Sequence, residues 1–269
     1  MLSPQEFGSP QVSVITGQAA YADAEALHTQ IEAAIAALHL PSGFIRAGDH
    51  VVIKPNWVKE HDTRTPQDES SWLTIITHPA VVREVARWAA GQLQGRGRVT
   101  LCDAPQSDSS FDTIRRLCGL DAIMEALRGE FPSITFALFD MRCEEWTIAD
   151  GVTVSKRELP SDPAGAVDIH LDEKSEFYGF KGLGRLYGAS YDFATTNRQH
   201  TDPNHEYRIC RTPMAADVLI NVPKLKTHKK SDSPSLSKIS SAPRPARTGC
   251  HGIPRALLLR GATNSLNPP

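Results

Sequence analysis

Short runs of consecutive apolar residues alternate with amphipathic helical stretches, and this alternation constrains the fold more than any other feature. Buried strands are predicted at 51–53, 99–102, 134–139 and 218–222. Strands without apolar–polar alternation are typical of sheets covered on both faces, and strands that alternate with helices are typical of parallel sheets. We therefore predict an α/β fold with a mainly parallel sheet covered by helices on both faces.

Helices are predicted where apolar residues recur at helical spacing, over 19–39, from Pro79 to the glycines at 95–97, and around 110–127. Thr77 is expected to cap the second helix, with Pro79 in its first turn. The other expected elements are a short strand at 12–16, weaker strands at 152–155 and 167–171, and a long polar loop at 57–76.

Length, charge and cysteine content exclude several classes of protein. The 269 residues, 40% of them hydrophobic, can bury a core in one large or two small domains. A net charge of -2 argues against nucleic acid or an anionic membrane as the main partner. Neither a signal peptide nor an apolar run of ~18 residues is recognisable. The five scattered cysteines form no C-x-x-C pair, which argues against a disulfide framework and indicates a cytoplasmic location.

Polar residues follow three of the buried strands. Lys54 and Asn56 follow the first, Asp103 ends the second, and Lys224 follows the last. Because ligands of parallel α/β sheets lie beyond the carboxyl ends of the strands, we expect Lys54, Asp103 and Lys224 at one edge of one sheet. Before Ser231 the chain holds 24 basic and 30 acidic residues, so a local group of cations is not part of a general basic surface.

Lys226 and His228 continue the polar turn after Lys224 at a spacing of two, which places all three on one side of an extended chain. Such a group of cations predicts a small anionic ligand, a phosphate or a carboxylate. The expected substrate-binding residues are Lys54, Asn56, Lys224 and Lys226, and the expected catalytic residues are Asp103 and His228.

Each of these residues also has an ordinary structural interpretation. Lys54 could be a solvated residue that ends a strand, and Asp103 could cap the next turn through its side chain. The run of lysines that begins at Lys224 could be a solvated charged turn. His78 is expected to be structural, as part of a helix-opening turn, with a ligand-binding or acid–base role as the alternative.

No metal or cofactor can be assigned from motifs. His200 and His205 miss the i,i+4 spacing that puts two ligands on one helical face, and Pro203 lies between them. The chain contains no Walker loop, no G-x-G-x-x-G, no G-x-S-x-G and no H-E-x-x-H. The cofactor is therefore unknown at this stage, and the metal expectation is none.

Residues 45–230 resemble the bacterial and archaeal domain of unknown function 362 family. The resemblance is carried by the segments VVIKPNWV, THPAVVREVARW, VTLCDAPQSD, YGASYDFATTNRQH and HEYRICRTPMAADVLINVPKLKTHKK. The lysine–histidine turn after a buried strand is its most specific mark. The resemblance implies one α/β domain over 1–230, and it carries over neither a reaction nor a cofactor, since the ferredoxin-like cysteine clusters of some relatives are missing here.

The chain departs from that family after Lys230. The family turn usually continues into G-x-T-x-S-L-K-N-L-V-G, then N-W-L-P, then G-G-D-x-F. A change of reading frame near Asp232 permits all three motifs in order, from the codons of 230–242, 248–251 and 261–265. Residues 231–269 are thus expected to be a frame-shifted tail, with a native disordered tail as the alternative.

The composition of 231–269 predicts disorder in either case. Its 39 positions hold seven serines, six prolines and no aromatic residue, so it cannot bury enough apolar surface to offset the entropy of ordering. The sheet is then incomplete at its C-terminus. Three functions stay open: an enzyme acting on a small anionic substrate, a non-catalytic binding or accessory module, and a non-functional truncated product.

Overall fold

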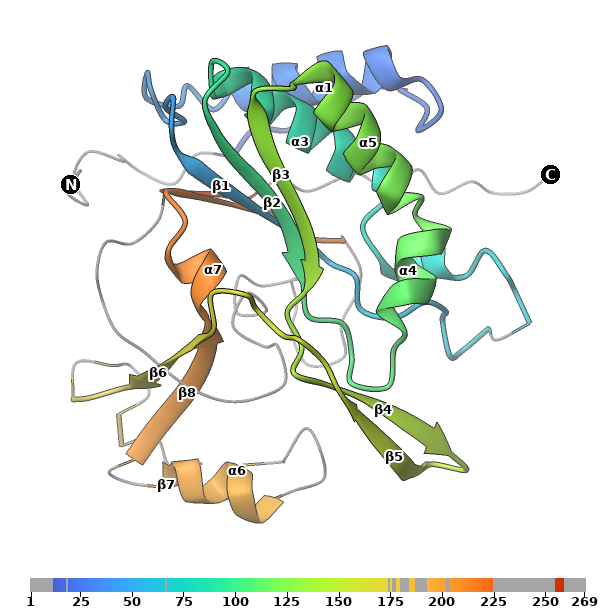
Figure 1. The fold of residues 1–269 in the computed structure, drawn as a ribbon, viewed down its shortest axis with the longest axis vertical. Coiled ribbons are helices and arrows are strands. Elements are labelled where there is room, and N and C mark those ends of the chain that lie inside the picture. The colour runs from blue at the N-terminus through green and yellow to red at the C-terminus, as the bar shows by residue number, and fades with distance from the viewer. Residues whose placement is uncertain are drawn as a thin grey trace.

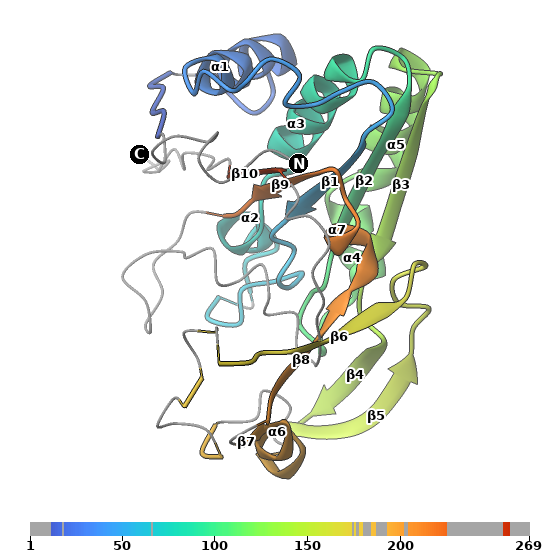
Figure 2. The same cartoon turned by 90° about the vertical axis from the view of Figure 1, so that its left-hand side faces the viewer.

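Parallel strands form the main sheet of the protein, in the order β10-β9-β1-β2-β3 (Figure 2). They are β1 (His50–Pro55), β2 (Gly97–Asp103), β3 (Ile134–Asp140), β9 (Val218–Val222) and β10 (Arg255–Leu258). The structure is a computed structural model that describes residues 12–17, 19–65, 67–173, 175, 178–179, 184–186, 193–201, 204–224 and 255–258. The predicted α/β fold with a mainly parallel sheet is confirmed.

Helices α1, α3 and α5 lie on one side of the sheet (Figure 1). The helices of the described chain are α1 (Ala24–Ala36), α2 (Trp72–Ile75), α3 (Pro79–Gln92), α4 (Phe111–Leu117), α5 (Leu120–Glu130), α6 (Phe193–Gln199) and α7 (Arg211–Met214). The single helix predicted around 110–127 is two helices, because Gly119 adopts a left-handed conformation (φ 59°) between α4 and α5. None of the described helices has the length and apolarity needed to cross a bilayer.

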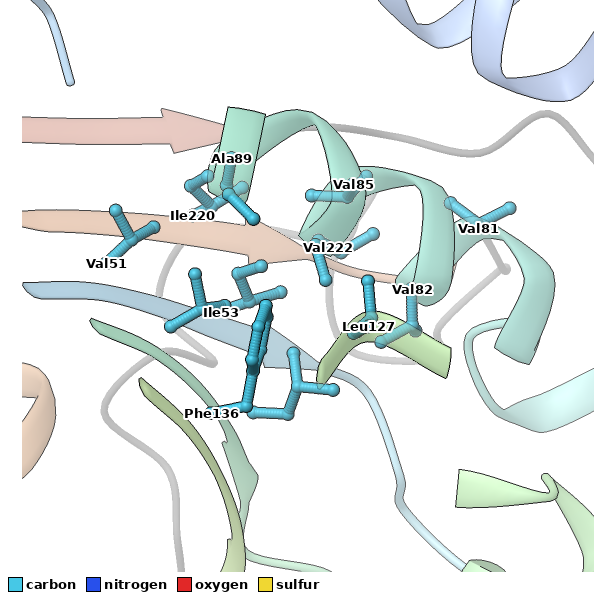
Figure 3. Close-up of a cluster of buried hydrophobic side chains, with 14 of the residues drawn as sticks. Val51, Ile53, Val81, Val82, Val85, Ala89, Leu127, Phe136, Ile220 and Val222 are labelled. Atoms are coloured by element: carbon cyan, nitrogen blue, oxygen red, sulfur yellow. The ribbon is translucent and has the colours of Figure 1, made fainter. Parts of the chain in front are cut away.

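The larger part of the core lies between the sheet and α3 (Figure 3). Val51 and Ile53 of β1 and Ile220 of β9 are fully buried there, against Val82 and Val85 of α3. Side chains of this size contribute about 1.5–3 kcal/mol each when they are fully buried. The unalternated strands therefore bury one set of side chains on this face.

The intervening residues of the same strands point to the opposite face. Val52, Cys102 and Leu219 form a second buried cluster there with Met141 and Ala216. The short helix α7 ends two residues before Ala216, a member of this cluster. Among the described residues, the side chains packed on the second face come from chain segments next to β3 and β9 and from the N-cap of α7, Cys210.

Two antiparallel units are inserted between β3 and β9. One is a hairpin, and the other is a small sheet in the order β6-β8-β7 (Figure 1). Their strands are β4 (Glu144–Ala149), β5 (Val152–Glu158), β6 (Ala166–His170), β7 (His200–Thr201) and β8 (Asn204–Cys210). The weaker strands predicted at 152–155 and 167–171 correspond to β5 and β6, whereas β4, β7 and β8 were not predicted.

Two expectations about the ends of the chain need correction. Residues 12–16 form no strand, because Val12 and Val14 are 86% and 80% exposed and no described strand pairs with them. The disorder expected over 231–269 does not hold for 255–258. These four residues form β10 because the open side of β9 supplies backbone partners, with Ala256 opposite Leu219. The rest of that segment lies outside the described residues.

Candidate functional site at the carboxyl ends of β1 and β9

The order of the strands reverses at β1. The chain passes from β1 to β2 and β3 on one side, and β9 lies on the other side of β1. In open α/β sheets, ligands bind beyond the carboxyl ends of the strands at such a switch point. Lys54 lies opposite Asn221 in the register of β1 and β9, so Lys54 and the turn before Lys224 are neighbours at this point.

The structure brings four of the six predicted site residues to this edge. Lys54 is the second-last residue of β1, Asn56 directly follows that strand, Asp103 ends β2 and Lys224 follows β9. The prediction that Lys54, Asp103 and Lys224 share one edge is confirmed. The other two residues, Lys226 and His228, lie outside the described residues.

Lys54 and Asp103 form a buried ion pair across β1 and β2. Lys54 Nζ lies 2.7 Å from Asp103 Oδ1, and the two side chains are 13% and 6% exposed. The other carboxylate oxygen, Oδ2, accepts a hydrogen bond of 2.6 Å from the backbone N–H of Trp57. Asp103 thus neutralises Lys54 and holds the turn after β1, so neither group is an uncommitted charge.

The segment 57–76, expected to be a loop, contains the short helix α2, and Asn56 holds its two ends together through its amide group and its backbone N–H. Its Nδ2 donates to the carbonyl of Ile75 at 2.9 Å, and its backbone N–H donates to Thr77 Oγ1 at 2.9 Å. The Thr77 hydroxyl in turn donates to the carbonyl of Val222 at 2.6 Å. One buried threonine therefore ties the loop to the ends of both β1 and β9.

Lys224 is the cation at this edge that lacks a counter-charge among the described residues. Its Nζ donates to the carbonyl of Leu73 at 2.7 Å, and it forms no ion pair with any described carboxylate. Burial lowers the pKa of Lys224, because water no longer fully solvates the charged form. An ammonium group in this state attracts an anion more strongly than a fully solvated lysine does.

His78, not Thr77 as predicted, is the N-cap of α3. Thr77 is unavailable because its hydroxyl is used by Val222, and His78 Nδ1 accepts a hydrogen bond of 3.2 Å from Ala80 N–H instead. The N–H groups of Val81 and Val82 reach the carbonyl of His78. With Pro79 at the first position, the described first turn of α3 has no open N–H for an anion.

Burial and the nearby charge of Lys224 lower the pKa of His78 to about 4, so its imidazole is neutral at pH 7. The ring of Tyr21 stacks on the imidazole with the centroids 3.8 Å apart and the planes at 10°. The N-cap contact confirms the structural role expected for His78. The His78 side chain also lies near Lys224, the cation without a described counter-charge.

Arg142 joins the segments that follow β2 and β3 at this edge, and this role could not be predicted from the sequence. Arg142 is buried and donates through Nη1 to the carbonyls of Gln106 and Ser109 at 2.7 Å each. Its Nη2 lies 2.7 Å from Asp140, whose pKa burial raises although the bonds from Arg142 oppose that shift. The N–H of Gln106 donates to the carbonyl of Val58 at 2.9 Å, which joins this segment to the loop after β1.

The buried thiol under the same edge is not set up as a nucleophile. Cys102 is fully buried at the end of β2, and burial raises its pKa well above the usual value. The thiolate is the reactive form of cysteine, so a thiol with a raised pKa is inert.

His200 and His205 are brought together although their spacing does not suit a helix. They lie opposite each other in the β7–β8 pair, with their Nδ1 atoms 3.1 Å apart. The Tyr207 hydroxyl lies 3.1 Å from His205 Nε2, and burial lowers the pKa of His205. Within the described residues no group of three or more His, Cys, Asp or Glu side chains is placed to hold a metal ion.

A surface cavity of about 280 Å³ lies at the other end of the sheet. Its lining includes Ile35 of α1, Phe44 in the loop that leads to β1, and Trp88 of α3. This cavity is remote from the polar strand ends and contains none of the predicted site residues.

Comparison with known proteins adds no relative. No protein-family model, no curated protein and no solved structure matches this chain.

Proposed function

We propose that the carboxyl edge at β1 and β9 binds a small anionic compound, a phosphate or a carboxylate. The observation that carries the proposal is the half-buried ammonium of Lys224, which has a carbonyl partner and no described counter-charge at the switch point of the sheet. Lys54 does not supply this charge, because Asp103 neutralises it at 2.7 Å. An anion that neutralises Lys224 recovers part of the free energy lost when the ammonium was desolvated.

Titration calorimetry at low ionic strength, with inorganic phosphate and with malonate as probes, tests this function. We expect weak binding that salt weakens further, and its loss in Lys224→Met, which keeps most of the length of the side chain and removes the charge. Lys156→Met is the matched control, because it removes one charge from β5, a strand that supplies none of the residues described at this edge, and the only described contact it loses is with the ring of Trp146. If neither probe binds, or if Lys224→Met binds as the wild type does, the proposed site is wrong.

An enzyme that acts on the same anion is the second candidate, with Asp103 and His228 in the catalytic roles. The buried Lys54–Asp103 pair favours the enzyme, because its ammonium and carboxylate lie 2.7 Å apart. A ligand bound between the two groups could accept a proton from Lys54 or donate one to Asp103. Against it, both oxygens of Asp103 already accept contacts. Proton NMR of bound malonate over hours tests this candidate: chemical conversion of the compound that Asp103→Asn abolishes identifies an enzyme.

We also propose a family for the chain and an origin for residues 231–269. Membership of the domain of unknown function 362 family, a frame-shifted origin of 231–269 and a non-functional product are linked, since the shift removes the family's later motifs. The nucleotide sequence around codon 232 tests the linkage: an alternative frame without those motifs contradicts it. A cytoplasmic location is proposed with it, and the four free cysteines of the described chain support a reducing compartment.

A further inference from the structure

His78 has a fixed orientation and a fixed tautomer. Its Nδ1 accepts the hydrogen bond from Ala80 N–H, so Nδ1 carries a lone pair and, in the neutral ring, Nε2 carries the proton. The stacked ring of Tyr21 and the start of α3 hold the plane of the imidazole. The Nε2–H group is therefore a directed donor that cannot become an acceptor while the helix cap is intact.

The imidazole lies near the cation of the proposed site. His78 directly follows Thr77, whose hydroxyl bonds the end of β9, and Lys224 comes two residues after that end. The two side chains are close enough for the charge of Lys224 to act on the imidazole. Within the described chain no protein group accepts a hydrogen bond from Nε2.

We infer that His78 is a ligand-binding residue, and that its Nε2–H donates a neutral hydrogen bond to the oxyanion whose charge Lys224 neutralises. The inference rests on the proposed function, and it assigns His78 a second role beside its helix cap. A neutral donor next to a lysine has a physical advantage over a second cation. It adds a hydrogen bond to the anion without the repulsion that two buried like charges impose on each other.

The lowered pKa of His78 supports this assignment, because the imidazole stays neutral, and Nε2 stays protonated, throughout the physiological range. The carboxylate or phosphate oxygen then meets the same donor at pH 6 and at pH 8. Affinity for a fully ionised carboxylate is expected to stay constant over that interval.

Two substitutions separate the cap of His78 from its donor. His78→Asn keeps a good N-cap, since an asparagine oxygen can accept Ala80 N–H, but it is too short to replace Nε2. His78→Gln places an amide N–H near the position of Nε2, but glutamine is a poor cap. We expect His78→Asn to melt near the wild-type temperature and to bind malonate about tenfold more weakly. We expect His78→Gln to melt lower and to keep most of the affinity.

The same titrations distinguish the failure of this inference from the failure of the proposed function. If Lys224→Met loses binding while His78→Asn binds as the wild type does, His78 is a cap only and the inference is overturned. If wild type and Lys224→Met behave alike, the site itself fails, and the inference fails with it. Nitrogen-15 NMR of the imidazole gives an independent readout: malonate should shift the Nε2 resonance of His78 and leave Nδ1 nearly unchanged.

Discussion

Asp103→Asn keeps the shape of the side chain and removes the charge that neutralises Lys54. In the wild type the ammonium of Lys54 lies 2.7 Å from Asp103 Oδ1, in side chains that are 13% and 6% exposed. The asparagine oxygen can still accept the N–H of Trp57, as Asp103 Oδ2 does, so that bond is largely kept. The amide N–H₂ of the variant then faces the ammonium, and the cation has no counter-charge.

Breaking a buried ion pair by removing one partner costs about 3–5 kcal/mol of unfolding free energy. Because Lys54 keeps some contact with solvent, we expect the lower end of that range, about 3 kcal/mol, for Asp103→Asn. Lys54→Met should lose a similar amount, since it leaves a buried carboxylate with one N–H partner. The double variant leaves no unpaired charge, so it should lose less than the sum of the two, with a coupling energy of about 2 kcal/mol.

Urea unfolding followed by tryptophan fluorescence measures these differences, since Trp57 is fully buried and its backbone N–H is bonded to Asp103. With a denaturant slope of about 1–3 kcal/mol/M, a loss of about 3 kcal/mol lowers the unfolding midpoint by about 1 M or more. A coupling energy below about 0.5 kcal/mol would refute the reasoning. It would mean that Lys54 is in effect solvated and that Asp103 acts only as a turn cap.

Three further predictions concern other parts of the fold. Glu84 of α3 is 1% exposed and lies 3.1 Å from His28 Nδ1, so Glu84→Ala should lose about 3 kcal/mol or more in urea unfolding, while the exposed Glu125→Ala should change little. Neighbouring residues of an edge strand direct their backbone N–H groups to opposite sides, so one of Ala256 and Leu257 donates its N–H toward β9. Replacing both with proline therefore removes a backbone hydrogen bond between β10 and β9. We expect a loss of about 1–3 kcal/mol, and an unchanged melting temperature would restore the expectation of a disordered tail. The lowered pKa of His78, about 4 against 6.5 in the unfolded chain, means that the unfolded state binds more protons between these values. Stability should therefore fall as the pH drops from 6.5 to 4, by about 1–2 kcal/mol after allowance for solvent screening, and His78→Asn should lose this dependence.

The parallel sheet and its polar edge could be predicted because both follow from short-range patterns. The runs at 51–53 and 218–222 have no alternation, so they had to be buried on both faces, and their carboxyl ends had to meet. The pattern does not give the order of the strands. The neutralisation of Lys54 by Asp103 depends on β1 lying next to β2, and no feature of either strand alone indicates it.

Other contacts were missed because they depend on long-range partners. Thr77 has the intrinsic properties of a helix cap, but the carbonyl of Val222 competes for its hydroxyl, and His78 takes over the cap. The tetrapeptide 255–258 carries too little apolar surface to order itself, yet the open side of β9 supplies hydrogen bonds that composition does not reveal. Strand β9 therefore determines both the N-cap of α3 and the formation of β10.

β9 lies inside the sheet, between β10 and β1, and this position sets the order in which a nascent chain can fold. His50 and Asp217, which are hydrogen-bonded at the start of the β1–β9 pair, are 167 residues apart. While the ribosome makes the two inserted antiparallel units, β1, β2 and β3 can pair, and the side of β1 that faces β9 stays open. That open side presents the backbone of Val51 to Ile53, a flat apolar edge of the kind that pairs with other chains. Association of unfinished chains should therefore be strongest for those released before residue 218, and it should decrease sharply once Val218–Val222 is available.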